Sequence, residues 1–243
     1  MIVSDLRPCD RLAVALDVPD LDDALRLAER VAPFAGVLKV GLELFVRSGP
    51  AAVERIRRAT DRDVFLDLKL HDIPETVERA VASARSSGAT LLTVHAAGGR
   101  AMLEAATRAA GGDLRILAVT LLTSLDGADL ADIGVAGGLD AQAERLFDLA
   151  WQSGVRGFVT SGKEVGRMRP RQAGAFLVTP GIRPAGGETG DQKRVATPEA
   201  AIAAGSDLLV VGRPVRDAAD PAEAARAVAA LIEAASAQAE RPA

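Results

Sequence analysis

The sequence is poor in cysteine and in aromatic residues. Cys9 is the single cysteine among 243 residues, so no intrachain disulfide can form. Aromatic residues make up 3% of the chain, tyrosine is absent, and 29 Lys and Arg against 33 Asp and Glu give a net charge of −4. Because basic stripes and aromatic side chains that stack on bases are both lacking, the composition disfavours nucleic acid as a partner.

Long uninterrupted apolar runs are also lacking. The segment from Met1 to Asp10 carries charges where a signal peptide would need an apolar centre. The alanine-rich segment from Ala218 to Ala243 is interrupted by Asp220, Pro221, Glu223, Arg226 and Glu233. We therefore expect no membrane segment but an amphipathic helix there, in a soluble protein of a reducing cytoplasm.

What the sequence does contain is a regular alternation of short apolar runs with longer helical patterns. The runs are rich in Val and Leu and do not alternate with polar residues, as is typical of parallel strands buried on both faces. Eight of them predict a closed (β/α)8 TIM barrel of the α/β class, with residues 1–243 as one domain. The predicted strands are Leu12–Asp17, Gly36–Gly41, Asp63–Lys69, Ala89–His95, Arg115–Leu121, Val155–Thr160, Ala175–Pro180 and Asp207–Gly212.

The most informative run extends from Asp67 to Pro74, where the third predicted strand ends. Side chains at i and i+2 of a strand share a face, so Asp67 and Lys69 are expected side by side, with Asp72 following at the turn. Parallel α/β folds place their chemistry at such carboxyl ends. The structural alternative is an ordinary ion pair, with Asp72 and Glu75 forming a capping box at the next helix.

Polar residues also follow other predicted strands. A purely structural barrel has no need of them at its mouth, where each unpaired charge carries a desolvation cost. A functional site is the simpler explanation. The residues concerned are Asp17, Lys39, His95 and Thr123, with the stretches after Pro180 and Val211.

The loops after the seventh and eighth strands have the features of a phosphate site. Gly212 would let the backbone approach an anion closely, and Arg183 or Arg213 could hold two phosphate oxygens. The glycine-rich segment from Gly181 to Gly190 is interpreted as a lid over the ligand. A flexible surface loop with solvated arginines is the alternative.

The two histidines and the cysteine fit this site only loosely. His71 and His95 have no neighbouring residues at metal-ligand spacing, so we expect structural hydrogen bonds from them rather than catalysis. Cys9 lies outside every strand-end cluster, and we expect it to be inert.

Taken together, the motifs resemble those of the bacterial orotidine 5′-phosphate decarboxylases, which catalyse the last step of de novo UMP synthesis. Each block alone is modest, but their order and spacing over nearly the whole chain make the resemblance specific. The blocks are Ala15-Leu16-Asp17, Leu38-Lys39-Val40-Gly41, Asp67–Thr76, Val94-His95-Ala96, Leu122-Thr123-Ser124, Thr179–Pro184, Asp191–Arg194 and Val211–Pro214.

The resemblance implies a charged catalytic array of Asp67, Lys69 and Asp72. It also implies that Asp72 and Thr76 reach into the site of a second subunit, so that a homodimer has two shared sites. The family commonly has Asn at the position of Glu75, and we treat this difference as peripheral.

The same resemblance implies how the substrate, orotidine 5′-monophosphate, and the product, UMP, are bound. Asp17 and Lys39 would hold the ribose hydroxyls, and Thr123 would contact the pyrimidine. The 5′-phosphate would be held by Arg183, Gln192, Gly212 and Arg213, with Gln192 also close to the base.

This chemistry can be stated in physical terms. Loss of CO2 from C6 leaves negative charge that the pyrimidine ring delocalises poorly, and the Lys69 ammonium can both stabilise that charge and protonate the carbon. Neighbouring carboxylates favour its charged form. No metal or organic cofactor is expected.

The sequence is compatible with two other functions. Metal-dependent 3-keto-gulonate-6-phosphate decarboxylases and hexulose-phosphate synthases share an Asp-x-Lys-x-x-Asp run, but they place a carboxylate ligand where this chain has Lys39, and that cation would repel Mg²⁺. A phosphate-ligand sensor without catalysis is the second alternative.

Overall fold

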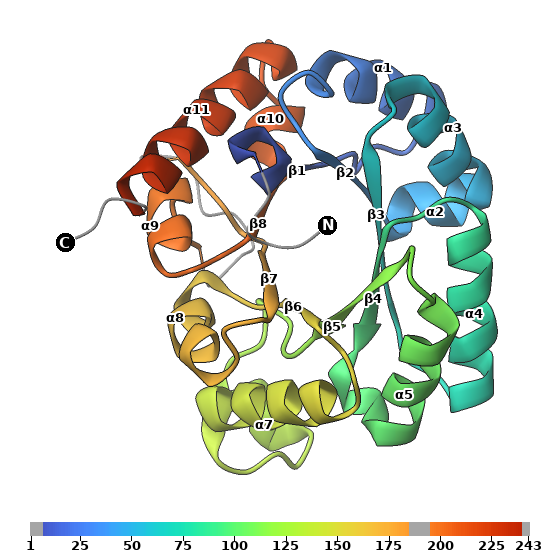
Figure 1. Ribbon diagram of the computed structural model, residues 1–243, viewed down its shortest axis with the longest axis vertical. Helices are drawn as coiled ribbons and strands as arrows, with labels where there is room; N and C mark the ends of the chain where they lie inside the picture. The colour runs from blue at the N-terminus through green and yellow to red at the C-terminus, as the bar shows by residue number, and fades with distance from the viewer. Residues whose placement is uncertain (1–6, 185–194, 240–243) are drawn as a thin grey trace.

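The computed structural model describes residues 7–184 and 195–239, and its centre is a closed barrel of eight parallel strands. The strands follow one another in chain order, and β8 pairs with β1 to close the barrel (Figure 1). The predicted (β/α)8 barrel is thus confirmed. The strands are β1 Leu12–Ala15, β2 Val37–Gly41, β3 Asp63–Leu70, β4 Leu91–His95, β5 Arg115–Val119, β6 Gly157–Val159, β7 Phe176–Thr179 and β8 Leu208–Val211.

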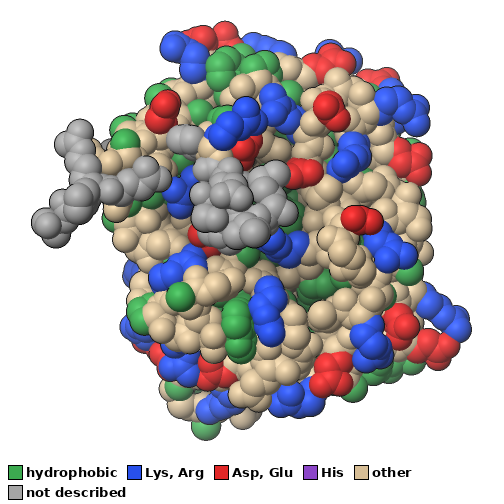
Figure 2. Space-filling view, viewed as in Figure 1, with side chains coloured by type: hydrophobic (Ala, Val, Ile, Leu, Met, Phe, Trp, Pro, Cys, Tyr) green, Lys and Arg blue, Asp and Glu red, His purple; other side chains and the backbone are tan. Residues whose placement is uncertain are grey.

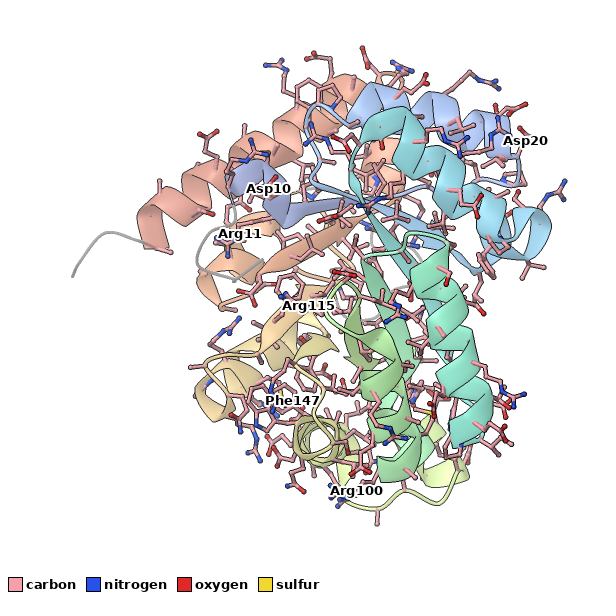
Figure 3. The ribbon with its side chains drawn as sticks, turned by 45° about the vertical axis from the view of Figure 1, so that its right-hand side comes forward. Asp10, Arg11, Asp20, Arg100, Arg115 and Phe147 are labelled. Carbon is pink, nitrogen blue, oxygen red and sulfur yellow. The ribbon has the colours of Figure 1, made fainter. Side chains whose placement is uncertain are left out.

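Helices surround the barrel and begin at recognisable sequence signals. Asp20 caps the first α-helix by accepting hydrogen bonds from the amides of Asp22 and Asp23, at 2.9 and 3.2 Å (Figure 3). Proline opens several others, because its missing N–H costs nothing in the first turn. The helices are η2 Pro8–Arg11, α1 Leu21–Val31, α2 Leu42–Ser48, α3 Pro50–Thr60, α4 Pro74–Ser86, η3 Ala96–Gly98, α5 Gly99–Ala110, α6 Gly127–Asp132, α7 Gly138–Gln152, α8 Gly162–Arg171, α9 Pro198–Ala203, α10 Arg213–Arg216 and α11 Pro221–Ala239.

The apolar core has two layers, one outside the strands and one inside the barrel. Outside, strand residues pack against the helices, as where Phe147 of α7 meets Phe158 of β6 with ring centroids 4.1 Å apart (Figure 3). Inside, side chains such as Phe65, Leu117 and Val178 form a separate buried cluster. The strand residues of the two layers alternate along the chain, since successive side chains point to opposite faces. The inner layer fills the centre of the barrel and leaves a mouth at each end.

The last helix, α11, has one buried face, as the sequence predicts. Ala225, Val228 and Ile232 are buried at the spacing of successive helical turns, whereas Glu233 is exposed. No helix within the described residues is both long and apolar enough to cross a membrane. On the face seen in Figure 2, side chains of both charge signs are interspersed.

Candidate active site

A cavity of about 580 Å³ lies at the carboxyl ends of the strands. It brings together residues that the sequence analysis took from distant parts of the chain, on strands from opposite sides of the barrel. The predicted site residues that line it are Asp17, Lys39, Asp67, Lys69, Thr123, Arg183, Gly212 and Arg213.

Four of these residues form a row of alternating charges. The Lys39 ammonium lies 2.8 Å from Asp17 Oδ1 and 3.9 Å from Asp67 Oδ2, and the Lys69 ammonium lies 2.8 Å from Asp67 Oδ1. The Lys39 side chain is buried, whereas the Lys69 side chain is 33% exposed. Within one chain, therefore, an anion lies between two cations, both of which line the cavity, and Lys69 is the more exposed of the two.

The electrostatic surroundings of Asp67 keep its carboxyl group ionised. Burial acts to raise its pKa, but the charges of Lys39 and Lys69 and hydrogen bonds from Lys69 and Thr93 outweigh burial, so the pKa lies below its ordinary value. Lys69 thus has a permanently charged partner at neutral pH.

Gly41 at the end of β2 makes room for this row. It is paired in register with Asp67 of β3, while Lys39 is paired with Phe65. A Cβ atom at Gly41 would lie 2.4 Å from Asp17 Oδ1 and 3.0 Å from Lys39 Nζ. The missing side chain is what allows the Asp17 and Lys39 side chains to meet above β2.

The backbone at Lys69 differs from the regular strand expected from the sequence. Lys69 has a φ of 52°, in the left-handed region, and the pairing of β3 with β4 shifts between Leu66 and Leu70. Asp67 and Lys69 do lie side by side, as predicted, but simple strand alternation is not the reason. The irregular backbone at Lys69 determines where its side chain lies.

Asp72 and Thr76 are exposed and do not line this chain's cavity. Asp72 Oδ1 accepts a hydrogen bond from the adjacent amide of Ile73 at 2.6 Å, and Ile73 itself occupies the cap position of α4. Glu75 is ion-paired with Arg79 one turn later. The capping box considered for Asp72 and Glu75 is therefore not formed, although Pro74 does occupy the first turn as expected.

The opposite wall of the cavity carries the arginines of the predicted phosphate site. Arg183 is 8% exposed and donates a hydrogen bond to the carbonyl of Ile182 at 2.8 Å. Arg213 begins α10 directly after Gly212. Gln192 and residues 185–190 of the predicted lid lie outside the described residues.

Arg216 is a cavity residue that the sequence analysis missed. Its guanidinium donates to the backbone carbonyl of Asp17 at 2.8 Å and is also paired with Asp217. Its position one helical turn after Arg213 was an available signal, because residues at i and i+3 share a helix face.

The two histidines form a stacked pair beside the charged row. The rings of His71 and His95 are 5.4 Å apart, and His95 Nδ1 accepts a hydrogen bond from the amide of Ala97. Burial, with smaller contributions from the charges of His71 and Lys69, lowers the pKa of His95. Among residues 7–184 and 195–239, no three His, Cys, Asp or Glu side chains are grouped so that they could hold a metal ion.

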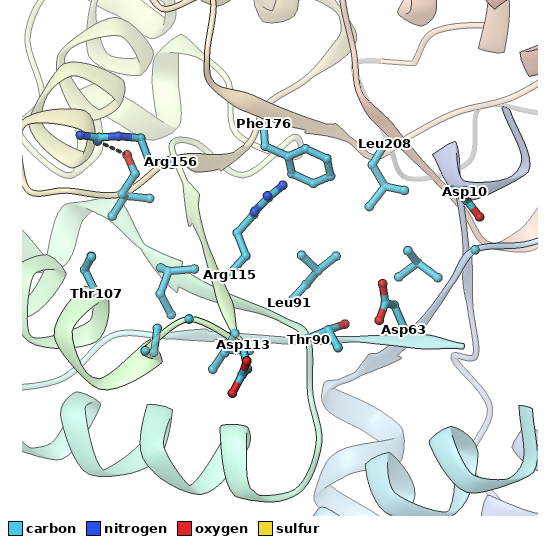
Figure 4. A pocket seen from close by; sticks show the side chains of 18 of the residues that line it. Asp10, Asp63, Thr90, Leu91, Thr107, Asp113, Arg115, Arg156, Phe176 and Leu208 are labelled. Atoms are coloured by element: carbon cyan, nitrogen blue, oxygen red, sulfur yellow. Dashed lines mark hydrogen bonds between the residues drawn. The ribbon is translucent and has the colours of Figure 1, made fainter. Parts of the chain in front are cut away.

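A larger cavity of about 680 Å³ lies at the other mouth of the barrel (Figure 4). There the Arg115 guanidinium stacks on Phe176, 4.4 Å from the ring centroid. Asp63 and Arg115 begin their strands, so this cavity lies at the amino ends of the strands, whereas enzymes of this fold have their active sites at the carboxyl ends. The row of charges, rather than the cavity volume, therefore identifies the candidate active site.

Comparison with known proteins gives one consistent family. The profile of the orotidine 5′-phosphate decarboxylase / HUMPS family matches residues 10–228. The orotidine 5′-phosphate decarboxylase of Anaeromyxobacter sp. (strain K) is 56% identical over 226 residues, which cover 93% of this chain and 99% of that protein. The enzyme of the same name from Thermobifida fusca (strain YX) is 52% identical, covering 91% of this chain and 95% of that protein.

A solved structure agrees with these sequence comparisons. The crystal structure of orotidine 5′-phosphate decarboxylase from Lactobacillus acidophilus superimposes with a TM-score of 0.81 at 31% identity. The match covers 92% of this chain and 99% of that chain.

Proposed function

The chain belongs to the orotidine 5′-phosphate decarboxylase / HUMPS family, and we propose that it converts orotidine 5′-monophosphate to UMP and CO2 in de novo pyrimidine biosynthesis. The names of its relatives support this substrate. The observation that carries the proposal is the Lys69 ammonium, 2.8 Å from Asp67 in a cavity whose other wall holds Arg183 and Arg213. We assign the reaction to the cytoplasm, as the sequence predicts.

Lys69 is the proposed catalytic cation. As the bond between C6 and the carboxylate carbon breaks, its electron pair stays on C6 and CO2 leaves. The ammonium stabilises this charge, then donates a proton to C6 and regains one from solvent. We place Asp67 close to the departing carboxylate, where its negative charge raises the energy of the bound substrate.

The charged row accounts for only part of the acceleration that this reaction needs. Two charges about 4 Å apart contribute roughly 4 kcal/mol at an effective dielectric constant near 20. The largest enzymatic accelerations require on the order of 20 kcal/mol. We assign the remainder to binding energy from groups distant from C6, which orders the site before reaction.

These distant groups divide into ribose, base and phosphate contacts. Asp17 and Lys39 are proposed to hold the ribose hydroxyls, since the two already face each other in the cavity. Thr123 is proposed to contact the pyrimidine. The proposed phosphate ligands are Arg183, Gln192, Gly212 and Arg213.

We further propose a homodimer in which Asp72 and Thr76 complete the partner's site. Both side chains are exposed, and neither lines the cavity of its own chain. Beside them Ile73 is 65% exposed, and Leu42, which follows β2 at the same mouth, is 52% exposed. Apolar side chains at this mouth favour burial against a second copy. In the dimer, Lys69 would then lie between two carboxylates.

The alternative within the family is a metal-dependent sugar-phosphate enzyme. Lys39 argues against it, because the buried ammonium bridges Asp17 and Asp67 at the position where such an enzyme needs a metal-binding carboxylate. No cofactor is part of the proposed mechanism.

The proposal is tested by mixing the purified protein with orotidine 5′-monophosphate in buffer containing EDTA and following the absorbance of the pyrimidine. We expect the same rate of turnover as in buffer without EDTA. Turnover of a sugar phosphate that requires Mg²⁺ would favour the alternative, and UMP binding without any turnover would favour the ligand sensor.

A further inference from the structure

The pairing between β3 and β4 leaves a gap at the charged row. Leu66 is paired with Leu92, and the next pair is Leu70 with Val94. Three residues of β3, from Asp67 to Lys69, therefore stand opposite the single residue Thr93 of β4. A regular parallel ladder would set one residue opposite one.

The hydroxyl of Thr93 bridges this gap. The backbone amide of Lys69 donates a hydrogen bond to Thr93 Oγ1 at 2.8 Å, and the same hydroxyl donates to Asp67 Oδ1 at 2.9 Å. The Lys69 ammonium also donates a hydrogen bond to Asp67 Oδ1, at 2.8 Å. Backbone amide, hydroxyl, carboxylate and ammonium thus form a closed ring of contacts. The Thr93 hydroxyl donates its single proton to Asp67, and its oxygen accepts the hydrogen bond from the Lys69 backbone amide.

Lys69 needs such an anchor because its backbone is strained. Among the described residues, the non-glycine residues with positive φ are Asp61 and Lys69. Asp61 ends the helix α3, where a left-handed residue is common. Lys69 has no such role, and an irregular conformation of this kind persists only where its surroundings hold it in place.

We infer that Thr93 is a positioning residue for the proposed decarboxylation, because its buried hydroxyl fixes both the Lys69 backbone and the Asp67 carboxylate. This inference rests on the proposed function of Lys69. Thr93 is completely buried and does not line the cavity. It therefore acts through Asp67 and Lys69 rather than on the substrate.

Thr93→Val tests this inference, since valine keeps the shape of the side chain and removes the hydroxyl. The Lys69 amide loses its acceptor, and Asp67 loses a hydrogen bond that favours its ionised form. We expect kcat to fall about 10- to 100-fold while KM changes less than about 3-fold, because the phosphate and ribose contacts are unchanged.

The pH profile separates positioning from simple packing. Without the hydroxyl, the pKa of Asp67 rises, so the acid limb of the kcat profile moves to higher pH. Thr93→Ser should restore both kcat and the acid limb, although it leaves a small cavity in the core. Loss of packing alone would not move the acid limb of the kcat profile. It would also not lower kcat selectively while KM stays nearly unchanged.

Thr120→Val is the matched control. Thr120 is equally buried, directly after β5, and its hydroxyl bonds to the carbonyl of Val159 at 3.4 Å rather than to the charged row. We expect kcat and its pH profile to be unchanged in this variant. If Thr93→Val does not fold, Thr93→Ser and Thr93→Ala give the same comparison of hydroxyl present and absent.

A titration of the Asp67 carboxyl carbon by NMR gives a readout without turnover, with Asp67→Asn to assign the signal. A higher Asp67 pKa in Thr93→Val supports the inference. An unchanged titration together with an unchanged kcat overturns it. An inactive wild-type protein would overturn the proposed function instead, and the titration would still decide whether Thr93 controls Asp67.

Discussion

At the scale of single residues, the site depends on a lysine in a backbone conformation that L-amino acids avoid. The left-handed region costs roughly 1–2 kcal/mol for a residue with a Cβ atom. At Lys69 this conformation accompanies an ammonium that is held on Asp67 and still faces the cavity. The chain accepts local strain at the position where we propose the chemistry.

Replacing Lys69 tests its proposed double role. Lys69→Ala removes both the electrostatic stabilisation and the proton donor, so we expect the decarboxylation rate to fall by more than about 10⁴-fold. UMP affinity should stay within about 10-fold, because the phosphate contacts remain. Turnover assays and UMP titration measure the two quantities. Lys163→Ala, at an exposed lysine of α8, is the control, and wild-type turnover in Lys69→Ala would remove Lys69 from the mechanism.

The pKa of Asp67 predicts how stability responds to acid. Because it lies below the unfolded value of about 3.9, the ionised carboxylate favours the folded state above that pH. The contribution is lost as the pH falls through the folded pKa. Between about pH 5 and pH 3, the free energy of unfolding should fall more in the wild type than in Asp67→Asn.

Urea unfolding at several pH values measures this difference, and Asp63→Asn, at the other end of β3, is the control. Parallel pH dependences in the wild type and Asp67→Asn would contradict the prediction.

At the scale of elements, the junction between β2 and α2 controls how Asp17 and Lys39 meet. Gly41→Ala places a Cβ atom within 2.4 Å of Asp17 Oδ1, so this carboxylate must move. A displacement of about 1 Å in a site can cost on the order of 100-fold, and we expect kcat/KM to fall about 10- to 100-fold.

Steady-state kinetics measure the effect of Gly41→Ala. Gly166→Ala in α8 is the control, because a Cβ atom there meets nothing within 4 Å. Equal kinetics in the two variants would show that the spacing of Asp17 and Lys39 is not critical.

The elements themselves could be predicted because their signals are local. Strands buried on both faces need continuous apolar runs, and each predicted run overlaps one strand of the barrel. The strand ends were less well predicted, and β1 ends at Ala15 rather than Asp17. Asp17 lies just beyond the end of β1, where its carboxylate accepts a hydrogen bond from Lys39 of the neighbouring strand β2.

What could not be predicted depends on contacts between distant segments. The conformation of Lys69 involves Thr93, 24 residues later, and the hydrogen bond from Arg216 to the Asp17 carbonyl joins residues 199 positions apart. No local pattern encodes such pairs. The roles of the site residues, the single domain over residues 1–243 and the homodimer stay predictions.

At the scale of the whole molecule, a shared site makes a distinctive prediction. If Asp72 acts on the partner's Lys69, the Lys69→Ala variant and the Asp72→Asn variant should each be inactive alone. A hybrid dimer of one subunit of each kind, however, contains one site in which both residues are intact. After subunit exchange at equal amounts, we expect about a quarter of wild-type activity. Size-exclusion chromatography would confirm the dimer. Absence of recovery in hybrids that do form would place all catalytic groups within one chain.

The irregular stretch of β3 has a consequence for how such an enzyme can change over time. Asp67, Leu68 and Lys69 lie between the Leu66–Leu92 and Leu70–Val94 pairs of β3 and β4, so the pairing of the two strands holds the barrel closed on either side of them. Substitutions at Asp67 and Lys69 can thus alter reactivity while the scaffold persists. Substitutions in this stretch could therefore change the reaction that is catalysed during evolution while the fold stays the same.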